Sequence, residues 1–165
     1  MRITLPYGRE TVPLYLDKKQ LIGVFSPVEV TGVPDASDEL GRSMANPVGC
    51  EGLQSLISAG KKVAIAVDDN TRVTPVQSIL TVLLEQMKSL GVKREDVVIV
   101  VALGTHRKMT EQEMKERYSP EVVEEYDIVN HDCNDPSGLR FLGKLPGNVP
   151  VYINKRFLGA DIRIG

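Results

Sequence analysis

Two segments of this sequence place chemically capable side chains directly after apolar runs. Val63–Val67 leads into Asp69 and Arg72, and Val97–Leu103 leads into His106. Histidine titrates near neutral pH and is therefore the natural carrier of a proton. Arginine offers a planar cation that binds phosphate or carboxylate through two hydrogen bonds. These residue types predict a site that binds an anion and moves a proton.

The elements around these residues predict where they lie. Both apolar runs are rich in β-branched residues, which is typical of buried strands in a parallel sheet. Thr74–Leu90 reads as a helix between them, and such strand-helix-strand units place the two strands side by side and parallel. Ligands of open α/β sheets bind beyond the carboxyl ends of the strands. We therefore expect Asp69, Arg72 and His106 to line one concave surface.

Each of these signals also has a simpler interpretation. Asp68 and Asp69 can cap the following helix and pair with Arg72, which leaves no ligand site. A single histidine such as His106 can be a loop residue held by backbone groups. No glycine-rich phosphate-binding motif occurs in the sequence to decide between the two interpretations.

A second group of polar residues follows the strand predicted from Asp127 to Asn130. The group His131, Asp132, Cys133 and Asp135 includes types that bind metals. Consecutive residues of an extended segment point to alternate sides, which is poor geometry for a single ion. This favours a hydrogen-bonded loop, and we assign no metal ligand.

Helix signals mark the ends of several elements. Thr74 is the predicted N-cap of the first long helix, with Pro75 at its first position and Gln77 completing a capping box. Gly91 is the predicted left-handed residue after this helix. A second capping box, Thr110-x-x-Glu113, opens a short helix that ends near Tyr118. The remaining predicted helices are Asp35–Ala45, Glu51–Ala59 (with Gly60 as its stop signal) and Glu121–Glu125.

The other strand candidates complete an α/β pattern. Ile3–Leu5 and Val12–Leu16 predict an N-terminal hairpin that turns at Gly8 and Arg9, with Leu21–Phe25 as a candidate third strand. Further candidates are Leu139–Leu142, Val149–Asn154 and an apolar run after Ala160-Asp161. We expect a three-layer Rossmann-like domain with a mostly parallel sheet and a small N-terminal β-hairpin region. Because the last run has only begun at Gly165, we expect residues 1–165 to be the N-terminal domain of a longer protein.

Composition excludes several classes of function. The 165 residues are 42% hydrophobic and 25% charged, as in ordinary globular domains. A net charge of -2 gives no reason to expect nucleic acid or an anionic membrane as a partner. Cys50 and Cys133 form no Cys-x-x-Cys pair, and the sequence has neither a signal peptide nor a membrane-length apolar run. The default expectation is a cytoplasmic protein.

Taken together, the motifs resemble the N-terminal domain of the nickel-dependent lactate racemase family. The resemblance covers nearly the whole chain, and its motifs occur in the family's order: Asp69-Asn-Thr-Arg72 with Pro75, Ala102-Leu-Gly-Thr-His-Arg-Lys-Met-Thr110 with Glu113, Val129-Asn-His-Asp132, Val151-Tyr-Ile-Asn-Lys155 and Ala160-Asp-Ile-Arg-Ile-Gly165.

The resemblance implies an isomerase that racemises or epimerises 2-hydroxy acids. Its cofactor is the nickel pincer nucleotide, a nickel-pyridinium-3,5-bisthiocarboxylate mononucleotide that takes a hydride from the substrate and returns it. His106 corresponds to one of two histidines that exchange a proton with the substrate hydroxyl. Asp69, Asn70, Thr71 and Arg72 correspond to the loop that binds the cofactor, and Arg72 also lies near the substrate.

The resemblance also implies that part of the active site lies elsewhere. The second catalytic histidine, the lysine that attaches the cofactor and the nickel-binding histidine follow the last motif in the family, so no residue here is assigned to them. His131 belongs to a different motif. We therefore expect the cofactor only in the full-length protein, a C-terminal domain of the same protein as partner, and an inactive chain when residues 1–165 stand alone.

Two other classes of function compete with the racemase. One is a nucleotide- or phosphate-binding module without catalysis of its own, in which His106 is structural. The other is a hydrolase or metal enzyme that uses His106, His131 and Asp132, although no nucleophile context or metal-binding histidine spacing supports it. The particular 2-hydroxy acid and the oligomeric state do not follow from the sequence.

Overall fold

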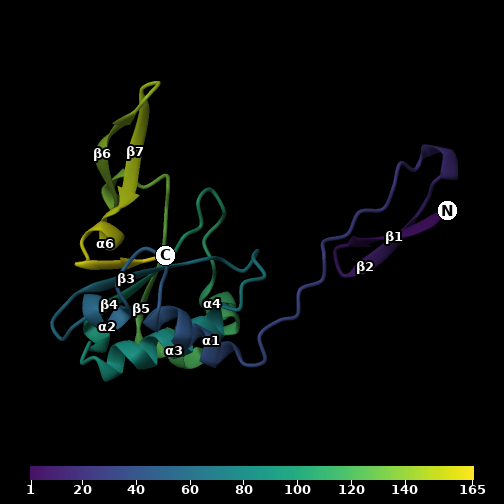
Figure 1. Ribbon diagram of the computed structural model, residues 1–165. Helices are drawn as coiled ribbons and strands as arrows, with labels where there is room; N and C mark the ends of the chain where they lie inside the picture. Colours follow the sequence, from purple (N-terminus) through teal and green to yellow (C-terminus); the bar gives the residue numbers. More distant parts are fainter. The chain divides into compact units, whose positions relative to one another are not determined.

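The computed structural model describes residues 1–165 and divides them into two compact units, Met1–Gly32 and Val33–Gly165. The first unit contains one antiparallel hairpin. The second contains a four-stranded parallel sheet, the helices α1 to α6 and a further antiparallel hairpin (Figure 1).

The first unit confirms the hairpin predicted at the N-terminus. β1 (Arg2–Tyr7) pairs with β2 (Glu10–Tyr15), and Gly8 adopts a φ of 62° in the turn between them. The strand predicted at Leu21–Phe25 is wrong, because only a 3-10 turn at Lys18–Gln20 follows the hairpin and no strand forms after it. The side chains of Ile22, Val24 and Phe25 in that segment are exposed, so little burial offsets the entropy lost in ordering a third strand.

The parallel sheet of the second unit has the strand order β5-β4-β3-β8. Its strands are β3 (Val63–Val67), β4 (Val97–Val101), β5 (Asp127–Asn130) and β8 (Ile162–Ile164). β3 and β4 are parallel neighbours with Val63 opposite Val97, as the strand-helix-strand pattern predicted. β8 joins the other edge of β3, and the backbone N–H of Lys62 donates to Asp161 Oδ2 (2.9 Å) at the start of this pairing.

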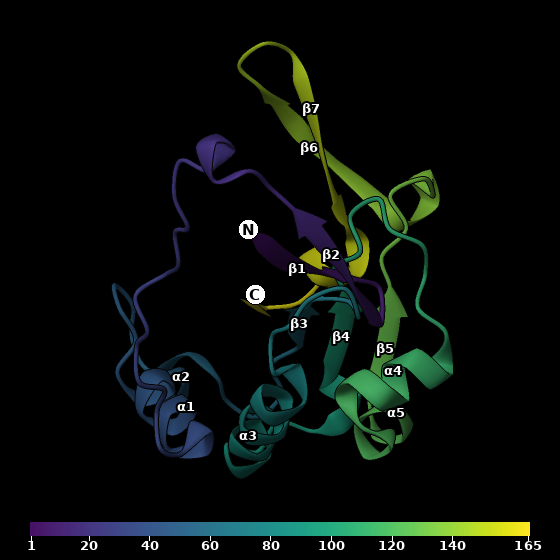
Figure 2. The same cartoon turned by 90° about the vertical axis from the view of Figure 1, so that its right-hand side faces the viewer.

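Helices cover the two faces of this sheet unequally. Both views place α1 (Ala36–Ala45), α2 (Leu53–Leu56), α3 (Val76–Ser89), α4 (Glu111–Tyr118) and α5 (Pro120–Glu125) on one side (Figures 1 and 2). The other face is covered by the single turn of α6 (Lys155–Leu158), which contacts β3 and β4 and continues from the hairpin of β6 (Leu139–Leu145) and β7 (Val149–Asn154). The predicted three-layer α/β fold is confirmed, with a thin third layer.

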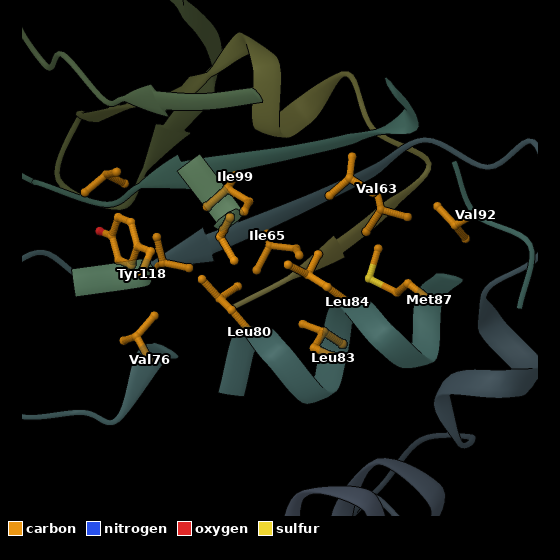
Figure 3. Close-up of a cluster of buried hydrophobic side chains, with 14 of the residues drawn as sticks. Val63, Ile65, Val76, Leu80, Leu83, Leu84, Met87, Val92, Ile99 and Tyr118 are labelled. Carbon is orange, nitrogen blue, oxygen red and sulfur yellow. The ribbon is translucent and has the colours of Figure 1, made fainter. Parts of the chain in front are cut away.

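The core lies between the sheet and α3. Leu80, Leu83, Leu84 and Met87 recur at helical spacing and are buried against Ile65 and Ile99 of the two central strands (Figure 3). Burial of each such side chain contributes about 1.5 to 3 kcal/mol. This packing fixes α3 across β3 and β4, and so fixes the loops at the carboxyl ends of these strands.

Two helix predictions need correction. Gln77 and Thr74 do not form a capping box: α3 begins at Val76, no side chain caps it, and the N–H of Val76 turns back to the carbonyl of Thr74 (2.8 Å). Pro75 is the central residue of an inverse γ-turn (φ -77°, ψ 61°) and stays outside the helix, so Thr74 lies one residue too early to cap it. The helix predicted at Glu51–Ala59 is only the four residues of α2, because Ile57 leaves the helix in an extended conformation to be buried in the core.

The other end signals act as predicted. Gly91 follows α3 with a φ of 82°, and Thr110 and Glu113 form the capping box of α4. Asp35 caps α1, and the strands at Val149–Asn154 and from Leu139 are present. Ser119 ends α4 and caps α5 with its hydroxyl, and it has an unusual φ of 92°.

Candidate functional site

The loops after β3 and β4 lie side by side at the carboxyl edge of the sheet. The N–H of Ala102 donates to the carbonyl of Val67 (2.8 Å), which joins the first residue of one loop to the end of the neighbouring strand. The chain then turns at Gly104, whose φ of 59° favours glycine, and the N–H of His106 donates to the carbonyl of Leu103 (2.9 Å). β4 therefore ends at Val101, two residues before the predicted end.

His106 and Asp69 meet across these two loops. His106 Nδ1 lies 2.6 Å from Asp69 Oδ2. The Asp69 side chain is 4% exposed and that of His106 is 49% exposed, so a buried carboxylate holds an imidazole that still reaches solvent. Two of the three predicted site residues are thus in direct contact.

The second oxygen of Asp69 belongs to its own loop. Asp69 Oδ1 accepts hydrogen bonds from the backbone N–H (2.9 Å) and the hydroxyl (2.6 Å) of Thr71. The bond from the Thr71 side chain, followed by that from His106, lowers the pKa of Asp69 to about 2 against the opposing effect of burial. An ionised Asp69 can only accept, so Nδ1 of His106 carries a proton, and in the neutral imidazole Nε2 is then the acceptor.

Arg72 lies on the same surface with its charge unpaired. Its side chain is exposed and forms no ion pair or side-chain hydrogen bond. It lines a hollow of about 220 Å³ together with Asp68, Asp69, Gly104 and His106. The interpretation in which the two aspartates cap α3 and pair with Arg72 is therefore wrong.

Asp68 has a different partner. Arg117 of α4 donates to its carboxylate (2.7 Å), and the buried Tyr118 hydroxyl donates to its backbone carbonyl (2.8 Å). These two contacts tie the loop after β3 to the C-terminal turn of α4. Burial raises the pKa of Tyr118, so its hydroxyl remains a donor.

The remaining predicted residues lie in a second hollow beside the first. Asn70, Thr71, Asp69, His106 and Arg107 line this volume of about 310 Å³. The Asn70 amide donates to Glu113 Oε1 (3.0 Å), and the Thr71 hydroxyl is engaged with Asp69. The four residues assigned to the cofactor loop therefore line two adjacent hollows. Two of them, Asp69 and Thr71, bond mainly to each other and to His106.

The polar group after β5 forms a loop of ordinary hydrogen bonds. Asn154 Nδ2 approaches His131 Nδ1 (3.4 Å), Lys108 pairs with Asp132 (2.9 Å), and Cys133 is exposed and free. No group of three histidine, cysteine or acidic side chains is arranged to hold a metal ion. The third class of function requires His106, His131 and Asp132 to form one cluster, and they do not.

Sequence reasoning missed three residues that hold the site. Glu113 had a visible signal, the Thr-x-x-Glu motif, but the motif indicates only a helix cap. Arg107 lies within a family motif that gave it no role, and Arg117 had no signal; the partners of both are known only once the loops and α4 are folded together. None of the helices combines the length and apolar character needed to cross a membrane.

Comparison with known proteins decides the family. A family model described as the lactate racemase N-terminal domain matches residues 7–165 of this chain. The chain belongs to this family. Lactate racemase from Thermoanaerobacterium thermosaccharolyticum is 30% identical over 164 residues, and lactate racemase from Lactiplantibacillus plantarum is 29% identical over 164 residues. In both cases the match covers 98% of this chain and 38% of the relative's length.

Solved structures agree with this assignment. The lactate racemase apoprotein from Thermoanaerobacterium thermosaccharolyticum is similar with a TM-score of 0.77 and 30% identity, over 99% of this chain and 38% of that protein. A Thermotoga maritima protein shares the fold with a TM-score of 0.63 at 21% identity, over 82% of this chain and 34% of that one. This lactate racemase N-terminal domain therefore spans well under half the length of the proteins that it resembles.

Proposed function

We propose that this domain supplies one acid–base histidine and part of the cofactor site of a lactate racemase-like isomerase of 2-hydroxy acids. The observation that carries the proposal is the contact of His106 Nδ1 with the buried Asp69 carboxylate at the carboxyl edge of the sheet. Families of α/β enzymes bind their ligands at this edge. Membership of the lactate racemase N-terminal domain family supports the reaction class.

In this proposal His106 moves the proton of the substrate hydroxyl. Nε2 is free to accept that proton because Nδ1 donates to Asp69. Asp69 stays ionised, since its pKa is about 2, and it stabilises the imidazolium formed when His106 becomes protonated. Return of the proton from Nε2 re-forms the same enantiomer, so His106 serves as base when that enantiomer is consumed and as acid when it is produced, and the second histidine serves the other enantiomer.

Arg72 is the proposed anion contact. A 2-hydroxy acid carries a carboxylate and a nucleotide carries a phosphate, and both match the two-pronged geometry of a guanidinium. The absence of an ion pair leaves the Arg72 charge available on the surface that it shares with His106. The uncapped start of α3 adds free N–H groups at the same edge.

The family's cofactor, the nickel pincer nucleotide, fits these donors in part. Arg72 and Asn70 would hold its nucleotide, while Asp69 and Thr71 keep the loop in shape. When bound, this cofactor supplies the acceptor for the hydride of the substrate carbon. No group of three metal-binding side chains exists here, and the family resemblance places the nickel-binding histidine and the attaching lysine after the last motif, so we place both functions outside residues 1–165. The second acid–base histidine belongs there too, in a C-terminal domain of the same protein.

The test is racemisation of lactate and other 2-hydroxy acids by the complete gene product and its variants. We expect His106→Ala to lower turnover by roughly two to four orders of magnitude, the usual contribution of a positioned acid–base group. Nickel content and thermal midpoint should stay near those of the unmodified protein. The matched control is His131→Ala, which removes the other histidine and should leave turnover nearly unchanged. Near-normal turnover by a folded, nickel-loaded His106→Ala protein would contradict the proposal.

The unpaired Arg72 also favours the second candidate, a nucleotide- or phosphate-binding module without catalysis. This candidate predicts that Arg72→Ala abolishes nucleotide binding whereas His106→Ala changes no measurable activity. Comparison of the two variants in binding and turnover assays therefore separates the candidates.

A further inference from the structure

One carboxylate outside the proposed reacting groups bonds to both loops of the site. Glu113 Oε1 accepts from Asn70 Nδ2 (3.0 Å) and from Arg107 Nη2 (2.6 Å). Glu113 Oε2 accepts from Arg107 Nη1 (2.8 Å) and from the backbone N–H of Thr110 (2.9 Å). The Glu113 side chain is 23% exposed, and its hydrogen bonds from Arg107 and then Thr110 lower its pKa to about 2.

The partners of Glu113 are the direct neighbours of the dyad. Asn70 follows Asp69 in the loop after β3, and Arg107 follows His106 in the loop after β4. Glu113 therefore connects the two backbones at the positions next to the 2.6 Å contact between His106 and Asp69. The bond to Arg107 is the bidentate carboxylate–guanidinium arrangement, which fixes orientation as well as distance.

Capping alone does not account for these contacts. A capping box needs the Thr110 N–H and the reciprocal bond from Glu113 N to Thr110 Oγ1 (3.2 Å), and both are present. The bonds to Arg107 and Asn70 come in addition and lead away from α4 toward the loops. Loops of this kind are mobile unless they are tied down, and an acid–base pair needs its partners held at hydrogen-bond distance.

We propose that Glu113 is a positioning residue that holds His106 against Asp69 and so maintains the tautomer with its proton on Nδ1. Glu113 does not touch the reacting atoms and acts through Arg107 and Asn70. The expected effect on turnover rests on the proposed function. The expected effect on the tautomer of His106 is independent of it.

The experiment observes the imidazole directly. The 165-residue chain contains two histidines, so nitrogen NMR of the labelled chain separates His106 from His131. We expect His106 in the unmodified chain to be the Nδ1–H tautomer with a downfield, protected Nδ1 proton. In Glu113→Gln this proton should be lost or broadened, and the tautomers should approach the mixture of an unrestrained histidine. Glu111→Gln is the matched control, since Glu111 lies on the same helix and pairs only with Lys115 (2.8 Å).

Two more variants separate positioning from capping and from unfolding. Thr110→Ala weakens the cap but keeps Glu113, Arg107 and Asn70, so it should leave the His106 tautomer unchanged. Arg107→Gln keeps the cap but removes the bidentate bond, so it should shift the tautomer even if Glu113→Gln fails to fold. A shift in Thr110→Ala as large as that in Glu113→Gln, or no shift in a folded Glu113→Gln or Arg107→Gln, overturns the inference.

Turnover provides a second readout in the complete gene product. We expect Glu113→Gln to lower kcat about tenfold, the lower end of what outer partners of functional histidines contribute. A gene product that racemises no 2-hydroxy acid would end the proposed function and leave the tautomer measurement valid. If the Glu113→Gln gene product racemises normally and its His106 tautomer is unshifted, the inference about Glu113 is contradicted and the proposed function is not.

Discussion

At the scale of single residues, the structure gives Asp69 a different role from the one that its sequence motif implied. The sequence motif placed Asp69 among cofactor contacts, but its two oxygens are engaged by Thr71 and His106 and its side chain is buried. A carboxylate so placed anchors a histidine more readily than it receives a ligand. Among Asp69, Arg72 and His106, the groups that remain open to a ligand are the Arg72 guanidinium and the Nε2 side of His106.

The first prediction concerns Asp69→Asn and pH. The Asp69 pKa is about 2 in the folded chain and near 3.9 in an unfolded one, so ionised Asp69 stabilises the fold above about pH 4. We expect the substitution to lower the free energy of unfolding by about 1 to 3 kcal/mol near neutral pH, because a charged acceptor of three hydrogen bonds is lost. The difference should shrink as pH falls from about 4 to about 2. Urea unfolding at several pH values measures it, and a difference independent of pH would contradict the pKa.

The second prediction separates binding from stability at Arg72. Since this side chain has no partner within the chain, Arg72→Ala should change the free energy of unfolding by less than about 0.5 kcal/mol. Under the proposed function, the complete gene product should nevertheless show a raised KM or a lower cofactor occupancy, through loss of the proposed anion contact. The control is Arg117→Ala, which removes the half-buried partner of Asp68 and should lower the thermal midpoint. Substantial destabilisation by Arg72→Ala would show that the arginine has a structural partner after all.

At the scale of elements, two similar motifs have different outcomes. Thr110-x-x-Glu113 forms a capping box, whereas Thr74-x-x-Gln77 does not, because an inverse γ-turn at Pro75 keeps that residue outside the helix. Sequence patterns alone treat the two alike. The difference arises from the backbone conformation of the residue after each threonine, which is helical at Glu111 and a turn at Pro75.

The third prediction uses this contrast. Thr110→Ala should lower the free energy of unfolding by about 1 kcal/mol, the usual value of a lost N-cap. Thr74→Ala should change it by less than about 0.5 kcal/mol, since the Thr74 hydroxyl caps no helix. Thermal or urea unfolding of the two variants in parallel measures the difference. Equal destabilisation by both would mean that Thr74 does cap α3 in solution.

The elements also show which parts of the site were predictable. Apolar runs rich in valine identified β3 and β4, and their parallel pairing was enough to bring Asp69, Arg72 and His106 to one edge. The ties around them were not predictable in this way. Asn70 bonds to Glu113 across 43 residues and Arg117 to Asp68 across 49, and such pairs depend on packing that no local pattern encodes.

At the scale of the whole chain, the core belongs to one unit. Every buried residue of the main hydrophobic cluster lies between Ile57 and Val122, within the unit Val33–Gly165. The unit Met1–Gly32 contains a two-stranded hairpin with exposed apolar side chains, and isolated hairpins are marginally stable. The unit Val33–Gly165 is therefore stabilised by a hydrophobic core, whereas the unit Met1–Gly32 is stabilised mainly by strand pairing.

The fourth prediction is that residues 33–165 fold without residues 1–32. Their thermal midpoint should lie within a few degrees of that of the whole chain, because the truncation removes no residue of the main cluster. Circular dichroism at increasing temperature provides the measurement. Loss of cooperative unfolding in the shortened chain would show that the N-terminal unit supports the core.

The fifth prediction is that residues 1–165 alone do not racemise lactate, even when nickel or the loaded cofactor is supplied. The chain spans 38% of the length of its curated relatives, and no group of metal-binding side chains exists within it. A chiral assay of D- and L-lactate after long incubation tests this. Measurable turnover would mean that the whole acid–base and cofactor machinery lies within these residues.

The pairing of β8 with β3 has a consequence for synthesis of the protein. Lys62 bonds to Asp161 across 99 residues, whereas β3 and β4 are joined locally through α3. Ribosomes add roughly 5 to 20 residues per second, so one edge of β3 waits about 5 to 20 seconds for its neighbour to emerge. During that interval an apolar strand exposes unpaired N–H and C=O groups, a state that invites pairing with other chains. Aggregation of newly made protein should therefore depend on how quickly translation passes from β3 to β8.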